Sequence, residues 1–233
     1  FGFGAMRLPL IDSQDKSSID MEELKKMVDE FMAAGFTYFD TAFPYHEQLS
    51  ENALKEALVD RYDRDSYIFA DKMPTVLVKS GDEYPMYFNK QLEKTGVGYF
   101  DYYLMHNMGR DRYFNTDKWG GFDFARRMKE EGKIKKFGFS FHDDAEMLDQ
   151  ILTEHPEVDF VQLQINYLDW DNKIIQSRAC YETARKYNKP IVVMEPVKGG
   201  TLASLPNEAA SLLLEYAPDV LSLIHISEPT RPE

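Results

Sequence analysis

Short apolar runs alternate along the chain with segments in which apolar residues recur at helical spacing. The apolar runs predict strands at residues 1–6, 36–41, 67–70, 102–105, 134–139, 160–163 and 191–194. The segments between them have the periodicity of amphipathic helices. The first helix is the clearest, because Asp20 and Glu23 have the spacing of an N-terminal capping pair and Gly35 has the position of a terminating residue.

The later helices follow the same scheme. They are predicted to start near residue 50 and to cover residues 88–94, 124–131, 147–152, 174–184 and 207–216. Asp143 and Glu146 form a second capping pair, in front of the helix at 147–152. Residues 107–118, after the fourth strand, predict a long loop. Strands and helices thus alternate at intervals of about 25–35 residues, which is typical of βα units.

Strands that alternate with helices form parallel sheets, and two architectures fit this order. A doubly wound Rossmann sheet needs a glycine-rich fingerprint after the first strand and a helix directly behind it. The first strand, Phe1-Gly2-Phe3-Gly4-Ala5-Met6, lacks the third glycine, and a long segment separates it from the next helix. The sequence therefore favours an α/β fold of the (β/α)8 TIM-barrel type, incomplete because the chain stops before an eighth strand.

The sequence at each end of the chain leads us to expect a fragment of a longer protein. Residue 1 is Phe and already belongs to a strand, so the chain is expected to start inside an element. Residues 222–233 continue no pattern and resemble a translated sequencing adapter. We therefore expect a partial barrel domain at residues 1–221 and a non-native tail at residues 222–233.

Composition narrows the classes of function. The chain has 233 residues, 43% of them hydrophobic, which is enough for one large domain with an extensive core. The net charge of −13 and the lack of a basic stripe argue against nucleic-acid binding. The one cysteine, Cys180, excludes a disulfide framework or a cysteine-ligated cluster within this chain, and a packing role is expected for it. No signal peptide or membrane span is predicted, so a cytoplasmic location is the default.

The predicted strands end in polar residues. These strand ends are Asp40, Lys72, His106, Ser140, Gln162 and Glu195. In a barrel the C-terminal ends of the strands meet at one face, and active sites lie there. Tyr45 follows Asp40 on the next loop and can point into the same pocket.

Four of these residues together suggest a general-acid assembly. Tyrosine has a pKa of about 10 and is a weak proton donor near neutral pH, but a neighbouring lysine stabilises the tyrosinate. Asp40 can neutralise and position Lys72, and His106 can orient a carbonyl oxygen by hydrogen bonding. With these three residues beside it, Tyr45 can deliver a proton to a carbonyl oxygen.

Other chemistries are less well supported. His46 and His142 lie on loops beside the predicted pocket and raise the alternative of a metal hydrolase. The histidine spacings of the common metal motifs do not occur, so no metal site is predicted. No nucleophile stands beside an obvious base, which argues against acyl transfer.

The combination of these motifs resembles the aldo/keto reductase superfamily. The resemblance rests on Asp40-Thr41-Ala42 with Tyr45, on Lys72 after a strand, and on Phe100-Asp101-Tyr102-Tyr103-Leu104-Met105-His106. Supporting stretches are residues 4–9, 138–140, 162–167 and 195–200. The resemblance covers residues 1 to about 220. It is closest to the bacterial branch in which a ferredoxin-like domain with a 4Fe-4S cluster often follows the barrel, and such a domain would lie outside this chain.

The resemblance implies a (β/α)8 barrel that binds NADP(H), with NAD as the alternative. It implies that Tyr45 is the proton donor, that Lys72 and Asp40 tune it, and that His106 orients the carbonyl group. It also implies cofactor-binding positions at Gly4, Met6, Ser140, Gln162, Glu195 and Lys198. Of these, Ser140 and Gln162 match the residues that hold the nicotinamide carboxamide.

Two positions depart from the family pattern. Phe141 stands where the residue after the serine is usually Asn, and Met194 stands where many members carry an aromatic residue against the nicotinamide. The orientation of the cofactor is therefore less well specified by the sequence than the four residues around Tyr45.

Two classes of function remain open. The first is an NAD(P)H-dependent oxidoreductase that reduces a small aldehyde or ketone to an alcohol. The second is a non-catalytic regulatory protein that binds a nicotinamide cofactor on the same fold. A small-molecule partner is expected, and no nucleic-acid or membrane partner. The sequence leaves the substrate and the oligomeric state open.

Overall fold

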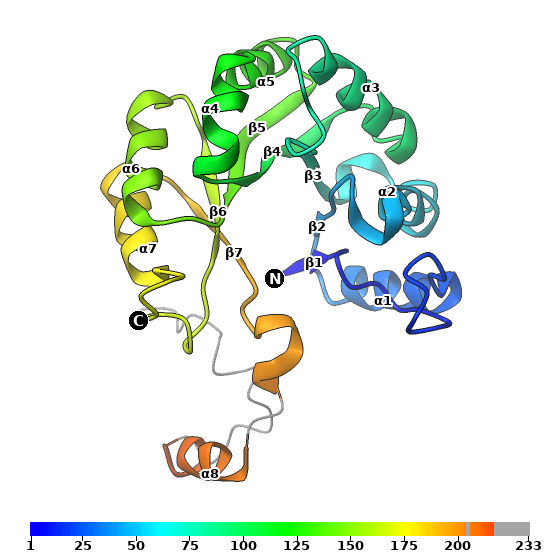
Figure 1. Ribbon diagram of the computed structural model, residues 1–233. Coiled ribbons are helices and arrows are strands. Elements are labelled where there is room, and N and C mark those ends of the chain that lie inside the picture. The colour runs from blue at the N-terminus through cyan, green and yellow to red at the C-terminus, as the bar shows by residue number, and fades with distance from the viewer. Residues whose placement is uncertain (204–205, 217–233) are drawn as a thin grey trace.

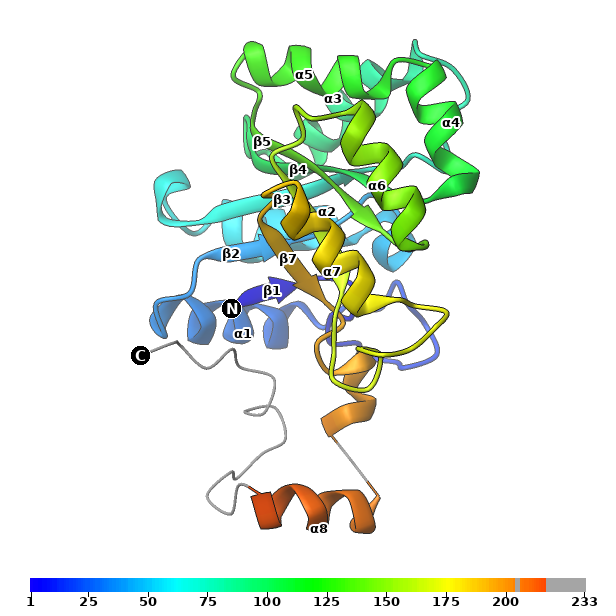
Figure 2. The same ribbon diagram turned by 90° about the vertical axis from the view of Figure 1, so that its left-hand side faces the viewer.

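The computed structural model describes residues 1–203 and 206–216, in which seven parallel strands form one curled sheet (Figure 1). The strands are β1 (Gly2–Gly4), β2 (Tyr38–Asp40), β3 (Ile68–Met73), β4 (Phe100–Met108), β5 (Ile134–Phe141), β6 (Phe160–Gln164) and β7 (Ile191–Met194). Each strand pairs with the next one along the chain. The side view in Figure 2 shows the strand arrows pointing toward one end of the molecule.

Helices follow the strands, and all but the last of them lie on the convex side of the sheet (Figure 1). They are α1 (Met21–Ala33), α2 (Ser50–Leu54), α3 (Glu83–Thr95), α4 (Arg110–Lys118), α5 (Gly121–Glu130), α6 (Ala145–Glu154), α7 (Ser177–Lys186) and α8 (Asn207–Tyr216). Shorter helical turns are η1 (Tyr45–Gln48), η2 (Lys55–Val59), η3 (Arg64–Ser66) and η4 (Lys198–Ala203). Within the described ranges, no helix is both long and apolar enough to cross a membrane.

The curled sheet is an incomplete (β/α)8 barrel, as the sequence predicted. The strands lie side by side in the same order as in the chain, from β1 to β7. No strand of the described residues closes the sheet between these two. The loops after them still meet, because Arg7 Nη1 lies 3.0 Å from Glu195 Oε1. The predicted tail, residues 222–233, and the end of the predicted domain at residue 221 lie outside the described residues.

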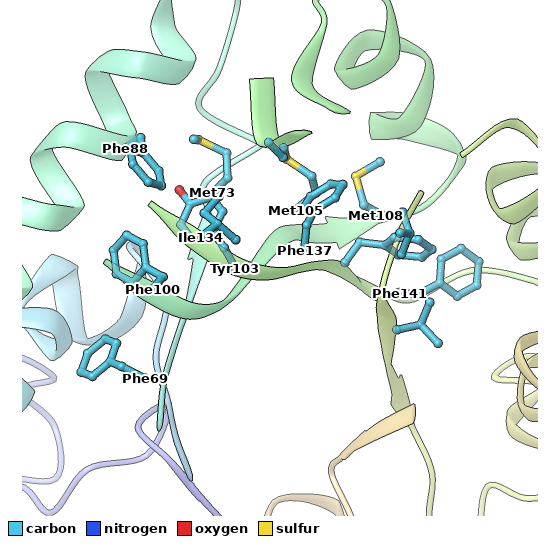
Figure 3. Close-up of a cluster of buried hydrophobic side chains, with 14 of the residues drawn as sticks. Phe69, Met73, Phe88, Phe100, Tyr103, Met105, Met108, Ile134, Phe137 and Phe141 are labelled. Atoms are coloured by element: carbon cyan, nitrogen blue, oxygen red, sulfur yellow. The ribbon is translucent and has the colours of Figure 1, made fainter. Parts of the chain in front are cut away.

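The sheet carries an apolar layer on each face. Successive side chains of a strand point to opposite faces, so residues two apart share a face. Figure 3 shows the large outer cluster, in which Phe100, Tyr103 and Phe137 pack between the sheet and the helices. Inside the barrel, Phe160 lies 4.9 Å from Tyr102 between ring centroids and packs with Ala70 and Leu104. This inner layer is the floor beneath the C-terminal strand ends.

Three local predictions were wrong. Residues 107–118 do not form a loop, because β4 extends to Met108 and α4 covers Arg110–Lys118. The capping residue of α6 is Asp144, which accepts from the Met147 N–H at 2.8 Å, and not Asp143. The Asp143 carboxylate instead accepts the backbone N–H groups of Arg110 and Asp144.

The third error concerns the helix predicted for residues 174–184. This helix, α7, begins only at Ser177, after a residue with left-handed backbone geometry, Gln176. The apolar spacing that suggested an earlier start includes Ile174, whose side chain is 88% exposed. An isolated apolar residue in a loop was thus read as part of the buried helical face.

Other local predictions were confirmed. Asp20 caps α1 by accepting the Glu23 N–H at 3.0 Å. The predicted last helix agrees with α8. Two boundaries differ from the expectation: the first strand is shorter, at Gly2–Gly4, and α3 begins five residues earlier, at Glu83.

Candidate active site

The inner face of the barrel gathers the predicted site residues at the C-terminal strand ends. Asp40 on β2, Lys72 on β3, His106 on β4 and Gln162 on β6 each lie two positions after a residue of the inner apolar layer, and Ser140 on β5 is the register neighbour of Gln162. The two-residue periodicity of strands therefore points them into the same space. All five stand above the Tyr102–Phe160 floor.

The ion pair between Lys72 and Asp40 is the centre of this arrangement. The Lys72 ammonium group contacts Asp40 Oδ1 and donates to the Thr41 carbonyl at 2.8 Å. Its side chain is almost completely buried. Burial lowers the pKa of Lys72, but Asp40 and Tyr45 outweigh that effect and the net pKa is raised. Lys72 therefore keeps its positive charge at neutral pH, since the lysine pKa is already about 10.4 in water.

Tyr45 lies between Lys72 and His106. Lys72 Nζ is 5.1 Å from the centroid of the Tyr45 ring, and the Tyr45 and His106 rings meet edge to face at 5.7 Å. Burial raises the pKa of Tyr45, and the charge of Lys72 offsets part of this rise. Tyr45 is thus a neutral phenol beside a cation that would stabilise its conjugate base.

A buried histidine fixes the turn that carries Tyr45. His46 Nε2 accepts the Leu8 N–H at 2.9 Å, and Nδ1 lies 2.9 Å from the Lys16 carbonyl. The ring is therefore a neutral tautomer with Nδ1–H as donor. Both ring nitrogens bind backbone, so His46 acts as a structural link between the Tyr45 turn and the loop after β1. His46 is therefore not available as a metal ligand, which weakens the metal-hydrolase alternative.

A β-bulge aims His106 into the barrel. The register between β4 and β5 shifts between Met105 and Met108, and Asn107 has a left-handed φ of 57°. Bulges commonly redirect side chains near active sites. Burial lowers the pKa of His106 to about 3, with the positive charge of Lys72 as the next cause. His106 is therefore neutral over the physiological range and offers one N–H donor.

Ser140 and Gln162 are register neighbours on β5 and β6. Gln162 Nε2 donates to Asp40 Oδ2 at 3.1 Å, which links β6 to β2 across the inside of the barrel. Ser140 Oγ accepts the Asn107 N–H at 2.7 Å and so supports the bulge. These two residues lie in the same space as the Tyr45 group, and they also support its geometry directly.

The other predicted cofactor positions lie around the rim. Gly4 ends β1, and a Cβ atom there would meet nothing within 4 Å, while Met6 beyond it is exposed. Glu195, after β7, pairs with Arg7. Lys198 donates to Asp169 Oδ1 at 2.5 Å, so its ammonium group is engaged within the protein. Lys198 is thus not brought together with the Tyr45 group.

Phe141, the departure at the usual asparagine position, points away from the site. It belongs to the outer apolar cluster, where it packs 6.2 Å from Phe139 between ring centroids (Figure 3). Because neighbouring strand residues face opposite sides, Ser140 points inward and Phe141 outward. The Phe141 side chain therefore has no part in the pocket.

A polar cluster behind Lys72 was missed by sequence reasoning. Asp71, on the outer face of β3, and Glu51, on α2, are fully buried. Asp71 Oδ1 accepts the Lys72 N–H at 2.8 Å, and Gln91 donates to the Glu51 carboxylate and to the Lys72 carbonyl, each at 3.0 Å. Glu51 also pairs with Lys94. The backbone of Lys72 is thus held on both sides by buried side chains.

Asp71 is the unusual member of this cluster. Its buried Oδ2 atom has no hydrogen-bond partner among the described residues. Burial and then the Glu51 carboxylate raise the pKa of Asp71 well above its usual range. A protonated Asp71 donates to Glu51 and satisfies both groups, which is the ordinary solution for two adjacent buried carboxyl groups.

Asp71→Asn is therefore expected to stabilise the protein at neutral pH. The raised pKa means that the folded state holds a proton that the unfolded state releases above about pH 4, so wild-type stability falls as the pH rises through this window. The asparagine side chain keeps one hydrogen-bond donor group and one acceptor, and it binds no proton whose retention in the folded state would make stability fall with pH. The difference in unfolding free energy between variant and wild type should grow by up to about 1.4 kcal/mol per pH unit from pH 4 upward.

Urea denaturation from pH 4 to pH 8 measures this effect. Asp159→Asn is a suitable comparison, because Asp159 is a partly exposed carboxylate that pairs with Lys129 at 2.6 Å. Its loss should destabilise the protein at neutral pH. A wild-type advantage over Asp71→Asn that widens as the pH rises would show that Asp71 is ionised in the folded protein.

Comparison with known proteins places these features in a wider context. The model of the Aldo/keto reductase family matches residues 1–212. No protein with a curated description matches the chain. Among solved structures, an aldo-keto reductase from Bacillus halodurans in its holo form has a TM-score of 0.70 at 20% identity, with 97% of this chain and 76% of that chain covered.

Two further structures are similar to the same degree. An aldo/keto reductase from Brucella melitensis has a TM-score of 0.69 at 19% identity, over 97% of this chain and 77% of its own. An aldo-keto reductase from Klebsiella pneumoniae in complex with NADPH has a TM-score of 0.69 at 16% identity, over 97% of this chain and 74% of its own. At this level of identity, the likeness establishes the fold.

Proposed function

The chain belongs to the aldo/keto reductase family, and from this premise we propose that it is an NAD(P)H-dependent oxidoreductase that reduces an aldehyde or ketone to an alcohol, with Tyr45 as the proton donor. The observation that carries the proposal is the position of Tyr45 between the Lys72–Asp40 ion pair and a neutral His106. The pairing of a phenol with a permanent cation suits proton delivery to a carbonyl oxygen.

The residues around Tyr45 fit a nicotinamide. Ser140 and Gln162 place a hydroxyl and an amide on adjacent strands, which are suitable hydrogen-bonding partners for a carboxamide. The space beside Gly4 is open, so a flat ring can approach the end of β1 without meeting a side chain there. The NADPH complex of the similar Klebsiella pneumoniae protein supports the same class of cofactor.

When bound, the reduced nicotinamide supplies a hydride to the carbonyl carbon. The protein's part is to hold and protonate the carbonyl oxygen. The neutral His106 donates one N–H to this oxygen and orients it toward Tyr45. Tyr45 releases its proton to the oxygen as negative charge develops there, and Lys72 stabilises the tyrosinate that remains. Asp40 fixes the position of Lys72, and Gln162 fixes Asp40.

Several finer points remain predictions from the sequence. These are NADP rather than NAD, a cytoplasmic location, the non-native tail at residues 222–233, and a 4Fe-4S domain in a longer form of the protein. Sequencing the complete gene would test the last two together. An uninterrupted reading frame that continues residues 222–233 into a further βα unit would contradict the prediction of a non-native tail.

A cofactor-consumption assay tests the proposed activity. Purified protein is mixed with NADPH and a panel of aliphatic and aromatic aldehydes, and the absorbance of NADPH is followed. Oxidation that depends on the aldehyde is expected. Tight binding of NADPH without turnover of any aldehyde or ketone would instead favour the regulatory alternative.

A further inference from the structure

Arg112 stands at the mouth of the candidate site. It lies in the first turn of α4, the helix that follows His106 and the bulge at Asn107. Its guanidinium is half-buried and donates from Nη1 to the Asn107 carbonyl at 3.3 Å. Its charge lowers the pKa of both His106 and His142, although burial is the larger cause for each. Arg112 therefore shares the space above the barrel with the carbonyl-orienting histidine.

The guanidinium has unused binding capacity. Arginine carries five N–H donors, and one long hydrogen bond to Asn107 uses only one of them. No carboxylate in residues 1–203 and 206–216 lies within ion-pair distance of Arg112, in a chain with a net charge of −13. Its neighbour Arg110, on the same helix, pairs with Asp144 at 3.3 Å.

The other charged groups near Arg112 and the two histidines already have partners within the protein. Lys72 is bound by Asp40, so it offers no free positive charge to a ligand. Glu195 raises the pKa of His142, but its carboxylate pairs with Arg7 at 3.0 Å, and the nearby Asp143 carboxylate accepts the backbone N–H groups of Arg110 and Asp144. Arg112 is only half-buried and has no carboxylate partner among the described residues, so its guanidinium is available to an anionic group of a ligand.

We propose that Arg112 is a specificity-determining residue that binds a carboxylate on the substrate, so that the preferred substrates are aldehydes or ketones that also carry a carboxylic acid. This inference rests on the proposed reductase activity. A planar guanidinium binds a carboxylate in a bidentate manner, which fixes orientation as well as charge. A single arginine suits a carboxylate better than a phosphate dianion, which usually gathers several cationic or backbone donors.

A pair of matched aldehydes tests the inference. The first is para-carboxybenzaldehyde, and the second is its methyl ester, which has a similar shape but no charge. The kcat/KM values of both are measured with NADPH for the wild type, for Arg112→Gln and for Arg110→Gln. Arg112→Gln removes the charge, and because its amide is shorter than the guanidinium it also gives up the 3.3 Å hydrogen bond to the Asn107 carbonyl; loss of that bond should act on both aldehydes alike, so the ratio of the two isolates the effect of the charge. Arg110→Gln is the control on the same helix.

The expected result concerns the ratio of the two kcat/KM values, acid over ester. The wild type should prefer the acid, and Arg112→Gln should lower this ratio by about 10- to 100-fold, as expected for the loss of a charge-assisted hydrogen bond. The ratio in Arg110→Gln should equal that of the wild type. Arg112→Lys keeps the charge and loses the planar fork, so its ratio should lie between the two.

Other results would overturn the inference. Equal losses on acid and ester in Arg112→Gln would show that Arg112 only supports the turn at Asn107. A weaker dissociation constant for NADPH, measured by fluorescence without aldehyde, together with an unchanged ratio would assign Arg112 to the cofactor. If the wild type and all variants reduce both aldehydes with the same acid-to-ester ratio of kcat/KM, this inference is wrong, while the proposed reductase activity stands. A wild type that reduces neither aldehyde nor any other carbonyl compound defeats the proposed function and this inference with it.

Discussion

Tyr45→Phe is expected to lower kcat for carbonyl reduction by about 10²- to 10⁴-fold, the usual contribution of a general acid. The phenylalanine ring keeps the edge-to-face contact with His106 and the position over Lys72, because only the hydroxyl is removed. The affinity for NADPH should change little, since Ser140 and Gln162 are the groups expected to hold the carboxamide. Steady-state kinetics and cofactor titration measure the two effects separately.

Tyr38→Phe is the matched control for this change. Tyr38 also points into the barrel and has a buried hydroxyl with no hydrogen-bond partner among the described residues. Removing that hydroxyl takes away an unsatisfied polar group, so folding should be unaffected or slightly favoured. Activity should stay near the wild-type level. A Tyr45→Phe protein with a kcat close to the wild type would mean that the proton comes from another group.

Gly138→Ala is expected to lower the free energy of unfolding by about 3 kcal/mol or more, at the upper end for overpacking. A Cβ atom at Gly138 would lie 2.5 Å from the Phe160 carbonyl oxygen and within 2.8 Å of two Phe160 ring carbons. The first neighbour is backbone, so the clash cannot be relieved by a side-chain rotation. The strands β5 and β6 must separate, and this also shifts Ser140 and Gln162.

Gly4→Ala is the control with the same chemical change. It lies on the inner side of the sheet like Gly138, but the added methyl group would meet no atom within 4 Å. Its unfolding transition, followed by circular dichroism in urea, should match that of the wild type. A Gly138→Ala transition that coincides with the wild type would show that β5 and β6 do not approach as closely as described.

The strands were predictable because each is a short apolar run followed by a polar residue at the barrel mouth. The α4 helix was not, and the reason lies in its composition. Only Tyr113 and Thr116 of α4 are buried, and its other residues are polar apart from Phe114, which is exposed. Helix periodicity is visible in a sequence only where a helix covers the core with several apolar residues. Arg112 was missed for the same reason, since it was placed in an unstructured loop.

Some residues of the candidate site could likewise be predicted from the sequence, and others could not. Asp40, Lys72 and His106 could be identified as strand ends, since the topology of a barrel brings such ends together. The hydrogen bond from Gln162 to Asp40 joins residues 122 positions apart, and it depends on the curvature of the sheet, which no local pattern specifies. Glu51 left a weak signal, because it shares the helical face of Leu54 and Leu58, where an acid is out of place.

Transfer of deuterium from the cofactor to the product tests the proposed reduction most directly. The protein is incubated with an aldehyde and with NADPH deuterated at the carbon that donates the hydride, and the alcohol is analysed by mass spectrometry. If the chain is a carbonyl reductase, the alcohol carries one deuterium on the former carbonyl carbon, and Tyr45→Phe forms this product at a rate lower by about 10²-fold or more. An alcohol without deuterium, or no alcohol despite saturating NADPH, would contradict the proposed function.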